Sequence, residues 1–338
     1  MKISYTLAMP ISGSKFANQV AICKHLLSCQ YQPDVILGTS GGCITGALLL
    51  ASDIGSIKCR DTYRTFCKKM DAILEDIESK YYLEPWSEFS PINTVMAIGN
   101  GSLYKRGQGT SFVDISKIDI THQPELWMGT HCKDDACHQL FCSKSRKHSI
   151  INLKDARYLN NKVSEVLQVT VASSAVPTIV PAVKIGKKNY CDGGISYASP
   201  LGSCMPAYDH EQLSYHVVYI CAVRYSSKDD PLTNEIEDDD VWSRISSSYA
   251  GMVTGLHIPD RNNGIRAVGP NAIKKKGTGK EFLKKCLSKQ NRARRSFIEL
   301  APLKGVHINF LTMEKGDALC AVNEAYSYGF SVRHWYVM

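Results

Sequence analysis

No hydrophobic run in this sequence approaches the roughly 20 apolar residues that a membrane-spanning helix requires. The chain also lacks a linker rich in proline, glycine or serine, an internal repeat and a low-complexity tract. Its first residues, Met1–Tyr5, lead into an expected strand and do not resemble a signal peptide. We therefore expect a cytoplasmic protein, either free or peripheral at membranes. Its 338 residues, 44% of them apolar, are enough for a sizeable core, and we expect a single domain over residues 1–338.

Phosphate-binding loops and paired zinc knuckles are missing too. Gly99–Ser102 is followed by neither G-x-G-x-x-G nor G-K-[ST], so we expect an ordinary turn there. The thirteen cysteines are scattered and odd in number, as is typical of reduced thiols in an intracellular protein. His131–His138 with Cys142 suggests zinc, but the spacing lacks C-x₂-C. The flanking segments Leu126–Thr130 and Gln139–Phe141 favour a β-hairpin, with a metal site as the alternative, and we expect no metal.

One short segment carries the strongest functional signal. The residues GTSGG, centred on Ser40, fit the nucleophile elbow G-x-S-x-G. Val35–Leu37 before it predicts a buried strand, and Cys43–Ala51 after it predicts a buried helix. Such a turn holds a serine hydroxyl on a strained backbone at the positive end of a helix. Gly38 and Gly42 let the helix begin close to the strand, although a glycine-rich packing turn would use the same residues.

An acidic residue far downstream is the expected partner of this serine. Asp192, Gly193 and Gly194 follow an expected strand that ends near Cys191. An acid at a strand end that points into a site can act as a general base. Two glycines after it allow a tight turn and the close approach of another backbone. An ordinary Asp-Gly turn is the alternative.

These motifs together resemble the patatin-like phospholipase family. The small-residue run Ala172–Pro177, followed by Pro181, is also similar to that family, and the likeness extends from about residue 2 to residue 200. The resemblance implies a catalytic dyad in which Ser40 attacks an ester carbonyl and Asp192 takes the hydroxyl proton and returns it to the leaving alcohol. It implies no cofactor and no metal. The substrate would be a phospholipid or another acyl lipid.

The dyad also implies that no histidine is needed, unlike a serine-histidine-aspartate triad. None of the ten histidines lies in a recognisable triad motif. His307 and His334 follow Asp192 in the chain, but nothing around either residue singles it out. A serine hydrolase with an unrecognised histidine is therefore a second hypothesis.

The glycine-rich loop of the family, usually G-G-G-x-R-G, is altered in this chain. Ile11, Ser12 and Gly13 occupy the three glycine positions, Lys15 replaces the arginine and Phe16 replaces the last glycine. The two bulky residues are expected to narrow or reshape the acyl entrance. The resemblance then implies either an active enzyme of altered specificity or an impaired one, and a non-catalytic lipid-binding scaffold is a third hypothesis.

An oxyanion hole needs backbone N–H groups, and these do not have to come from glycine. Ser12, Gly13 and Ser14 carry such groups, and Gly41 supplies another one directly after the nucleophile. Lys15 keeps a positive charge but lacks the planar fork of arginine. We expect these five residues to form the oxyanion hole.

The net charge of +8 is concentrated near the C-terminus. Lys274–Arg295 holds ten basic side chains and one acid, Glu281, and its middle part, Phe282–Leu287, has a partial apolar face. Such a segment can lie on an anionic membrane, where each basic residue contributes about 1 kcal/mol. Nucleic acid is a rival partner that we do not expect, and a solvated basic loop and helix is the plain alternative. The acidic run Glu235–Asp240 predicts an exposed loop that caps a helix beginning at Val241.

Strands and helices alternate along the remaining sequence, which predicts an α/β fold with a mostly parallel central sheet and helices on both faces. Residues 201–338 are expected to complete the sheet. The leading functional hypothesis is a lipid acyl hydrolase of the phospholipase A type, with another serine esterase or acyltransferase as an alternative. The further expected elements are helices at Asp61–Lys80, Val163–Ala175, Val241–Leu256 and Asp317–Ser331, and strands at His216–Val223 and Gly305–Leu311.

Overall fold

The computed structural model describes residues 5–77, 119–177, 182–210, 215–222, 241–290, 292–306 and 316–338. Several sequence predictions therefore lie outside the described residues. They are the turn at Gly99–Ser102, the acidic run Glu235–Asp240, Pro181, His307 and most of the strand expected at Gly305–Leu311.

Among the described residues, eleven strands form one sheet. Its centre is parallel throughout, in the order β3-β2-β1-β8-β10. The central strands are β1 (Thr6–Met9), β2 (Val35–Thr39), β3 (Glu125–Cys132), β8 (Tyr215–Ile220) and β10 (Arg295–Pro302). The outer strands are β4 (Cys137–Cys142), β5 (Arg157–Tyr158), β6 (Val183–Ile185), β7 (Lys188–Asp192), β9 (Ile273–Thr278) and β11 (Phe330–Val337). The predicted mixed α/β fold with a mostly parallel sheet is confirmed.

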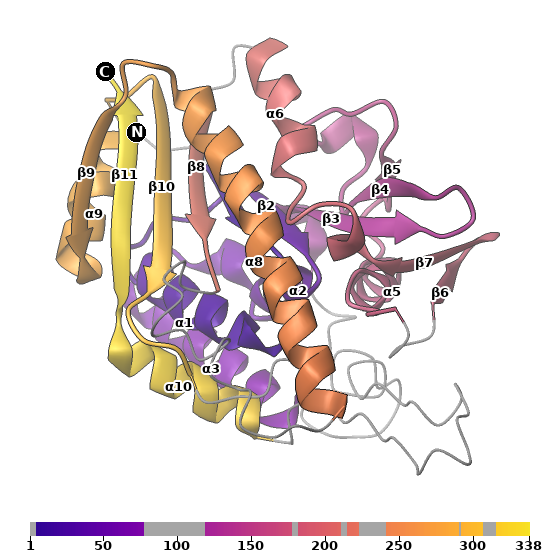
Figure 1. Cartoon of the computed structure of the whole chain (residues 1–338). Coiled ribbons are helices and arrows are strands. Elements are labelled where there is room, and N and C mark those ends of the chain that lie inside the picture. Colours follow the sequence, from indigo (N-terminus) through magenta and orange to yellow (C-terminus); the bar gives the residue numbers. More distant parts are fainter. Residues whose placement is uncertain are drawn as a thin grey trace.

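Helices cover both faces of this sheet. The helix α8 crosses one face, and α1, α2, α3, α9 and α10 lie on the other side (Figure 1). The helix bounds are α1 (Phe16–Leu27), α2 (Gly41–Ala51), α3 (Arg60–Asp76), α5 (Val163–Ser173), α6 (Leu201–His210), α8 (Val241–Val268), α9 (Gly279–Gln290) and α10 (Asp317–Tyr328). Strands that are covered on both faces are apolar on both sides, as expected for a parallel sheet.

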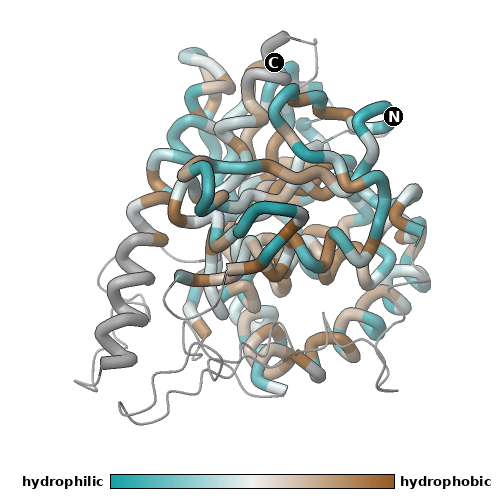
Figure 2. Tube along the Cα trace, turned by 90° about the vertical axis from the view of Figure 1, so that its right-hand side faces the viewer, coloured by the Kyte–Doolittle hydropathy of each residue, from teal (hydrophilic) through white to brown (hydrophobic). Residues whose placement is uncertain are grey.

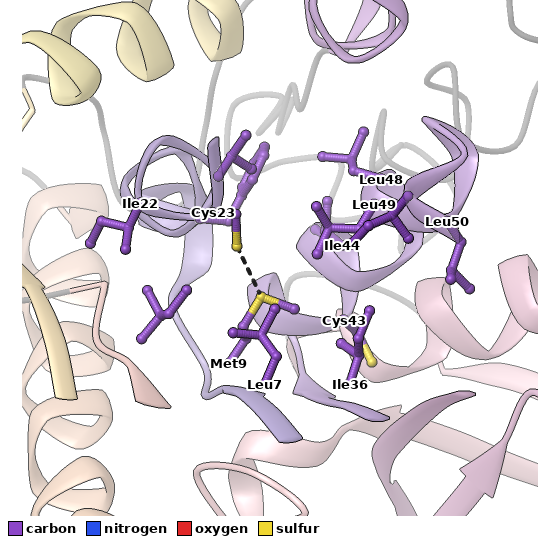
Figure 3. Close-up of a cluster of buried hydrophobic side chains, with 14 of the residues drawn as sticks. Leu7, Met9, Ile22, Cys23, Ile36, Cys43, Ile44, Leu48, Leu49 and Leu50 are labelled. Carbon is purple, nitrogen blue, oxygen red and sulfur yellow. Dashed lines mark hydrogen bonds between the residues drawn. The ribbon is translucent and has the colours of Figure 1, made fainter. Parts of the chain in front are cut away.

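The strand side chains divide between two hydrophobic clusters. Leu7 and Met9 of β1 point into the cluster that also contains α1 and α2, where Met9 Sδ lies 3.8 Å from Cys23 Sγ (Figure 3). Ala8, between them, belongs to the cluster on the side of α6 and α8. This alternation follows from the two-residue period of a strand. Ser40 directly follows the C-terminal end of β2, whose side chains also divide between the two clusters.

Hydrophobic and hydrophilic stretches of the described chain are short and change frequently along the trace (Figure 2). Of the helices within the described ranges, none is both long and apolar enough to cross a bilayer.

The C-terminal third differs from the sequence expectations. The predicted helix Val241–Leu256 continues to Val268 and passes through Pro259. A proline inside a helix costs about 3 kcal/mol. Beyond Pro259, α8 is held against β8 and β10 by hydrogen bonds from Tyr215 to the Gly264 carbonyl and from Arg261 to Glu299. The expected final helix ends at Tyr328, because Gly329 has a φ of 74° and β11 begins at the next residue.

The basic segment also differs from the loop and helix that the sequence suggested. Lys274, Lys275 and Lys276 are exposed on β9, which is an edge strand paired with β11. A row of lysines on an edge strand opposes pairing with another chain. Residues Gly305 and Val306, the described start of a predicted strand, follow β10 as irregular backbone. That residues 1–338 form a single domain remains a prediction.

Candidate active site

Ser40 occupies a strained turn between β2 and α2. Its φ and ψ of 54° and −124° are unusual for a residue with a side chain. The two flanking glycines make this turn possible. A Cβ on Gly38 would lie 2.7 Å from the Gly42 carbonyl oxygen, and a Cβ on Gly42 would lie 1.9 Å from the Met9 carbonyl oxygen. The helix α2 therefore begins in direct backbone contact with β1 and β2, which fixes the direction of the serine.

Asp192 lies beside this serine at the end of β7. Ser40 Oγ donates a hydrogen bond to Asp192 Oδ2 over 2.7 Å, and the N–H of Gly194 donates to Asp192 Oδ1 over 2.7 Å. A Cβ on Gly193 would lie 2.3 Å from the Gly129 carbonyl oxygen of β3. The glycine at 193 is thus required for β7 to reach β3, and this contact brings the carboxylate to the serine.

Burial tunes the carboxyl group of Asp192. The side chain is only 6% exposed, and this desolvation raises its pKa from 3.8 to about 6. The hydrogen bonds from Ser40 and Gly194 oppose the rise, because both stabilise the carboxylate. Near neutral pH the group is mostly ionised yet far more basic than an exposed aspartate. This combination suits a group that must accept and return a proton.

Two serines at the end of α5 hold the elbow in place. Ser173 Oγ accepts a hydrogen bond from the N–H of Ser40 over 2.9 Å and donates to the Gly129 carbonyl over 2.6 Å. Ser174 Oγ donates to the Ser40 carbonyl over 3.2 Å. The sequence singled out this run only as small residues typical of the family. The only indication in the sequence was a pair of adjacent serine hydroxyls in this run. That they hydrogen-bond to the backbone of Ser40 could be seen only in the fold.

The altered glycine loop, Ile11–Lys15, packs against the start of α2, and we call it the oxyanion loop after its expected role. A Cβ on Gly41 would lie 2.6 Å from the Gly13 carbonyl oxygen and 3.2 Å from the Gly13 nitrogen. Gly13 itself has a φ of 51°, which a glycine adopts without strain. The N–H of Lys15 already donates to the Ser12 carbonyl. Within the described residues, the N–H groups of Gly13, Ser14 and Gly41 donate to no backbone or side-chain acceptor.

The charged and bulky residues of this segment are buried. Lys15 is 2% exposed, and its Nζ donates a hydrogen bond to the Val306 carbonyl over 3.1 Å. The side chain of Phe16 packs in the hydrophobic cluster around α1. Ile11 is buried, and its methyl groups come within about 3 Å of the position that a Cβ on Gly194 would take. Ile11 is therefore the bulky residue of the loop that contacts the Asp192 turn.

The family model for patatin-like phospholipases matches residues 13–205, which is more than half of the chain. The chain belongs to the patatin-like phospholipase family. Members of this family are typically lipid hydrolases, and this patatin-like chain has the family's mixed α/β architecture. No curated protein matches the sequence significantly. Among solved structures, VipD from Legionella pneumophila is similar at 10% identity and a TM-score of 0.35, over 97% of this chain and 67% of VipD.

The histidines of this patatin-like chain make other contacts. His334 Nε2 pairs with Ser296 Oγ, His131 Nδ1 pairs with Ser196 Oγ, and His257 Nε2 lies 2.7 Å from the Ile11 carbonyl oxygen. Among the described residues, no histidine hydrogen-bonds to the serine at 40 or the aspartate at 192. His307 lies outside the described residues.

The histidine- and cysteine-rich segment forms the predicted hairpin. The strands β3 and β4 are antiparallel, and Cys132 faces Cys137 at the turn. In the part of the chain that the structure describes, no group of three or more histidine, cysteine or acidic residues has a metal-binding arrangement.

Proposed function

We propose that this protein hydrolyses the ester bond of a phospholipid or another acyl lipid, with phospholipase A-type chemistry. The single observation that carries the proposal is the 2.7 Å hydrogen bond from Ser40 Oγ to a buried carboxylate of Asp192, on a strained elbow in a chain of this family. The elbow, the base and the family each point to acyl transfer through a serine.

The chemistry runs in two halves. Ser40 Oγ attacks the carbonyl carbon while Asp192 Oδ2 accepts the hydroxyl proton, and the carbonyl oxygen becomes an oxyanion. When the tetrahedral intermediate collapses, the bond to the leaving alcohol breaks and the alcohol takes the proton from Asp192. A water molecule then attacks the acyl-serine with Asp192 as its base, which releases the fatty acid and restores the hydroxyl of Ser40.

The backbone N–H groups of Gly13, Ser14 and Gly41 are the proposed donors to the oxyanion, since they have no other acceptor within the described residues. Ser12 supports them by shaping the loop that packs on Gly41. Lys15 acts through the loop, because its ammonium group binds the Val306 carbonyl. No cofactor or metal has a role in this scheme.

Apolar and basic surface supports a lipid substrate. Ile195 and Tyr197, three and five residues after Asp192, are 45% and 52% exposed. Beside the edge strand β9, Leu283 and Leu287 of α9 are buried in the core, and lysines of the same helix are exposed. The apolar face expected for membrane insertion is thus buried. We propose that Lys274–Arg295 gives a cytoplasmic protein a purely electrostatic, peripheral contact with anionic membranes.

Fatty-acid release from mixed phospholipid vesicles tests the proposal. Ser40→Ala and Asp192→Asn are compared with wild type, and with Ser288→Ala and Asp155→Asn as controls at exposed positions. We expect both site variants to lose release and covalent labelling by a fluorophosphonate, and both controls to keep them. Complete loss of both release and labelling on changing a single histidine would instead favour a triad. Vesicle binding without release or labelling in the wild type would favour the scaffold hypothesis, for which the altered oxyanion loop is the supporting observation.

A further inference from the structure

One buried histidine on α8 contacts the oxyanion loop directly. His257 is 0% exposed, and its Nε2 lies 2.7 Å from the Ile11 carbonyl oxygen. The N–H of Ile11 donates in turn to the Ala198 carbonyl, six residues after Asp192, over 2.8 Å. The peptide groups on both sides of Ile11 are therefore fixed by contacts with other segments of the chain.

This contact requires a hydrogen on one particular ring nitrogen of His257. A carbonyl oxygen can only accept a hydrogen bond, so His257 Nε2 must carry the hydrogen. Burial lowers the pKa of His257 to about 4, although the bond to Ile11 opposes the change. The ring is therefore neutral near pH 7, and its donated hydrogen bond does not depend on a charge.

Fixing the Ile11 carbonyl also fixes the N–H group that follows it. No peptide bond in the described chain is cis, and in a trans peptide the N–H points away from the C=O of the same unit. The direction of the Ile11 carbonyl thus sets the direction of the Ser12 N–H and of the backbone that leads into Gly13. Gly13 is the residue whose backbone packs against Gly41.

The turn of α8 that carries His257 is itself anchored. Four residues on, Arg261 Nε forms an ion pair with the buried Glu299 of β10 at 2.9 Å. Three residues on, Asp260 Oδ2 accepts a hydrogen bond from Ser199 Oγ over 2.6 Å. One turn of α8 therefore connects the sheet, the segment after Asp192 and the oxyanion loop.

We propose that His257 is a positioning residue for the oxyanion loop, holding the Ile11–Ser12 peptide in the orientation that presents the loop to the substrate oxyanion. This inference rests on the proposed function. His257 acts through the backbone and does not touch the substrate. Small errors in such a loop reduce catalysis strongly, because a donor must lie where the charge develops.

Three variants of the full chain test this role. His257→Phe keeps a ring of similar size and removes the donor, whereas His257→Gln restores an N–H near the position of Nε2. His334→Phe is the matched control, because His334 is also fully buried and forms a ring hydrogen bond, to Ser296 Oγ at 2.8 Å. For each variant, kcat and KM are measured on a soluble nitrophenyl ester, together with hydrogen exchange of the backbone over residues 7–16.

We expect His257→Phe to lower kcat by about 10- to 100-fold with little change in KM, and to speed exchange over residues 7–16. His257→Gln is expected to recover most of the loss, and His334→Phe is expected to keep the kcat and the loop exchange of wild type. If His257→Phe does not fold, His257→Asn replaces it, and Gln is expected to be several-fold more active than the shorter Asn.

The proposal is overturned if Gln is no better than Phe or Asn, or if His257→Phe and His334→Phe have the same kcat and the same loop exchange. An inactive wild type that also fails to label with fluorophosphonate would refute the proposed function alone. The exchange over residues 7–16 would still decide whether His257 holds the loop.

Discussion

Replacing Asp192 by asparagine should stabilise the folded protein while it abolishes hydrolysis. The carboxylate is buried, yet both of its hydrogen bonds have counterparts in an amide. The asparagine oxygen accepts from the Gly194 N–H, and its NH₂ group donates to Ser40 Oγ, so that the serine becomes an acceptor. The substitution therefore removes the cost of a buried charge and keeps both hydrogen-bonded contacts, although the hydroxyl hydrogen of Ser40 loses its acceptor.

The magnitude follows from the pKa. In the folded state it rises from 3.8 to about 6, and at about 1.4 kcal/mol for each tenfold change this corresponds to about 3 kcal/mol. The folded state binds the proton more tightly than the unfolded state, so wild-type stability falls as pH rises from about 4 to about 6 and is level above that. Asp192→Asn does not titrate. Its advantage should be near zero at pH 4 and about 3 kcal/mol at pH 8, equivalent to about 4 °C in Tm for 338 residues.

Urea unfolding followed by fluorescence at pH 4.5, 6 and 8 measures this difference. Asp155→Asn is the matched control, since its carboxylate is exposed and should change stability little at any pH. The reasoning is refuted if Asp192→Asn differs from wild type by the same amount at pH 4.5 and pH 8. It is also refuted if the wild type is the more stable protein at pH 8.

Three further outcomes follow from the site. Because Asp192 must be ionised to act as a base, kcat/KM on a soluble ester should fall about tenfold per pH unit below about pH 6 and be level just above that pH. A flat profile down to pH 4.5 would contradict this role. Ser173→Ala removes the acceptor of the Ser40 N–H, so the free energy of unfolding should fall by about 1–3 kcal/mol and labelling by a fluorophosphonate should slow. Unchanged labelling would mean that the elbow keeps its geometry without Ser173. Gly42→Ala should prevent folding, because the new Cβ would overlap backbone atoms. Gly255→Ala should keep or raise Tm, because the space around Gly255 is open and alanine favours a helix. Equal solubility and Tm for the two variants would contradict the packing described.

The parts of the site that the sequence predicted are those encoded locally. The elbow around Ser40 requires glycines within two residues of the serine, and the Asp192 turn requires the glycine that follows it. Ser173 and His257 were not predicted as part of the site, because their targets lie 133 and 246 residues away in the chain. The sequence does not indicate whether a serine hydroxyl or a histidine ring will hydrogen-bond to a distant backbone group. Tertiary contact alone gives these residues their place.

The strand β10 was not predicted from the sequence either, because it contains polar residues whose partners are far away in the chain. Its sequence includes Ser296 and Glu299, and both are almost completely buried. Their polarity hides the strand in a pattern search, since a buried parallel strand normally reads as an apolar run. In the fold, His334 and Arg261 provide their partners.

The order of the strands has a consequence for the protein during its synthesis. The ribosome releases β1 and β2 first, but they form the middle of the sheet and wait for β3 on one side and β8 on the other. Ser40 leaves the ribosome 152 residues before Asp192, its proposed base. The helix α8 follows later than both residues. The nascent chain therefore carries the proposed nucleophile without its base. It also carries a pair of strands, β1 and β2, whose outer edges are still unpaired, which favours slow folding and exposes the chain to aggregation. If Ser40 and Asp192 form the proposed catalytic centre, its parts come together only when most of the polypeptide has left the ribosome.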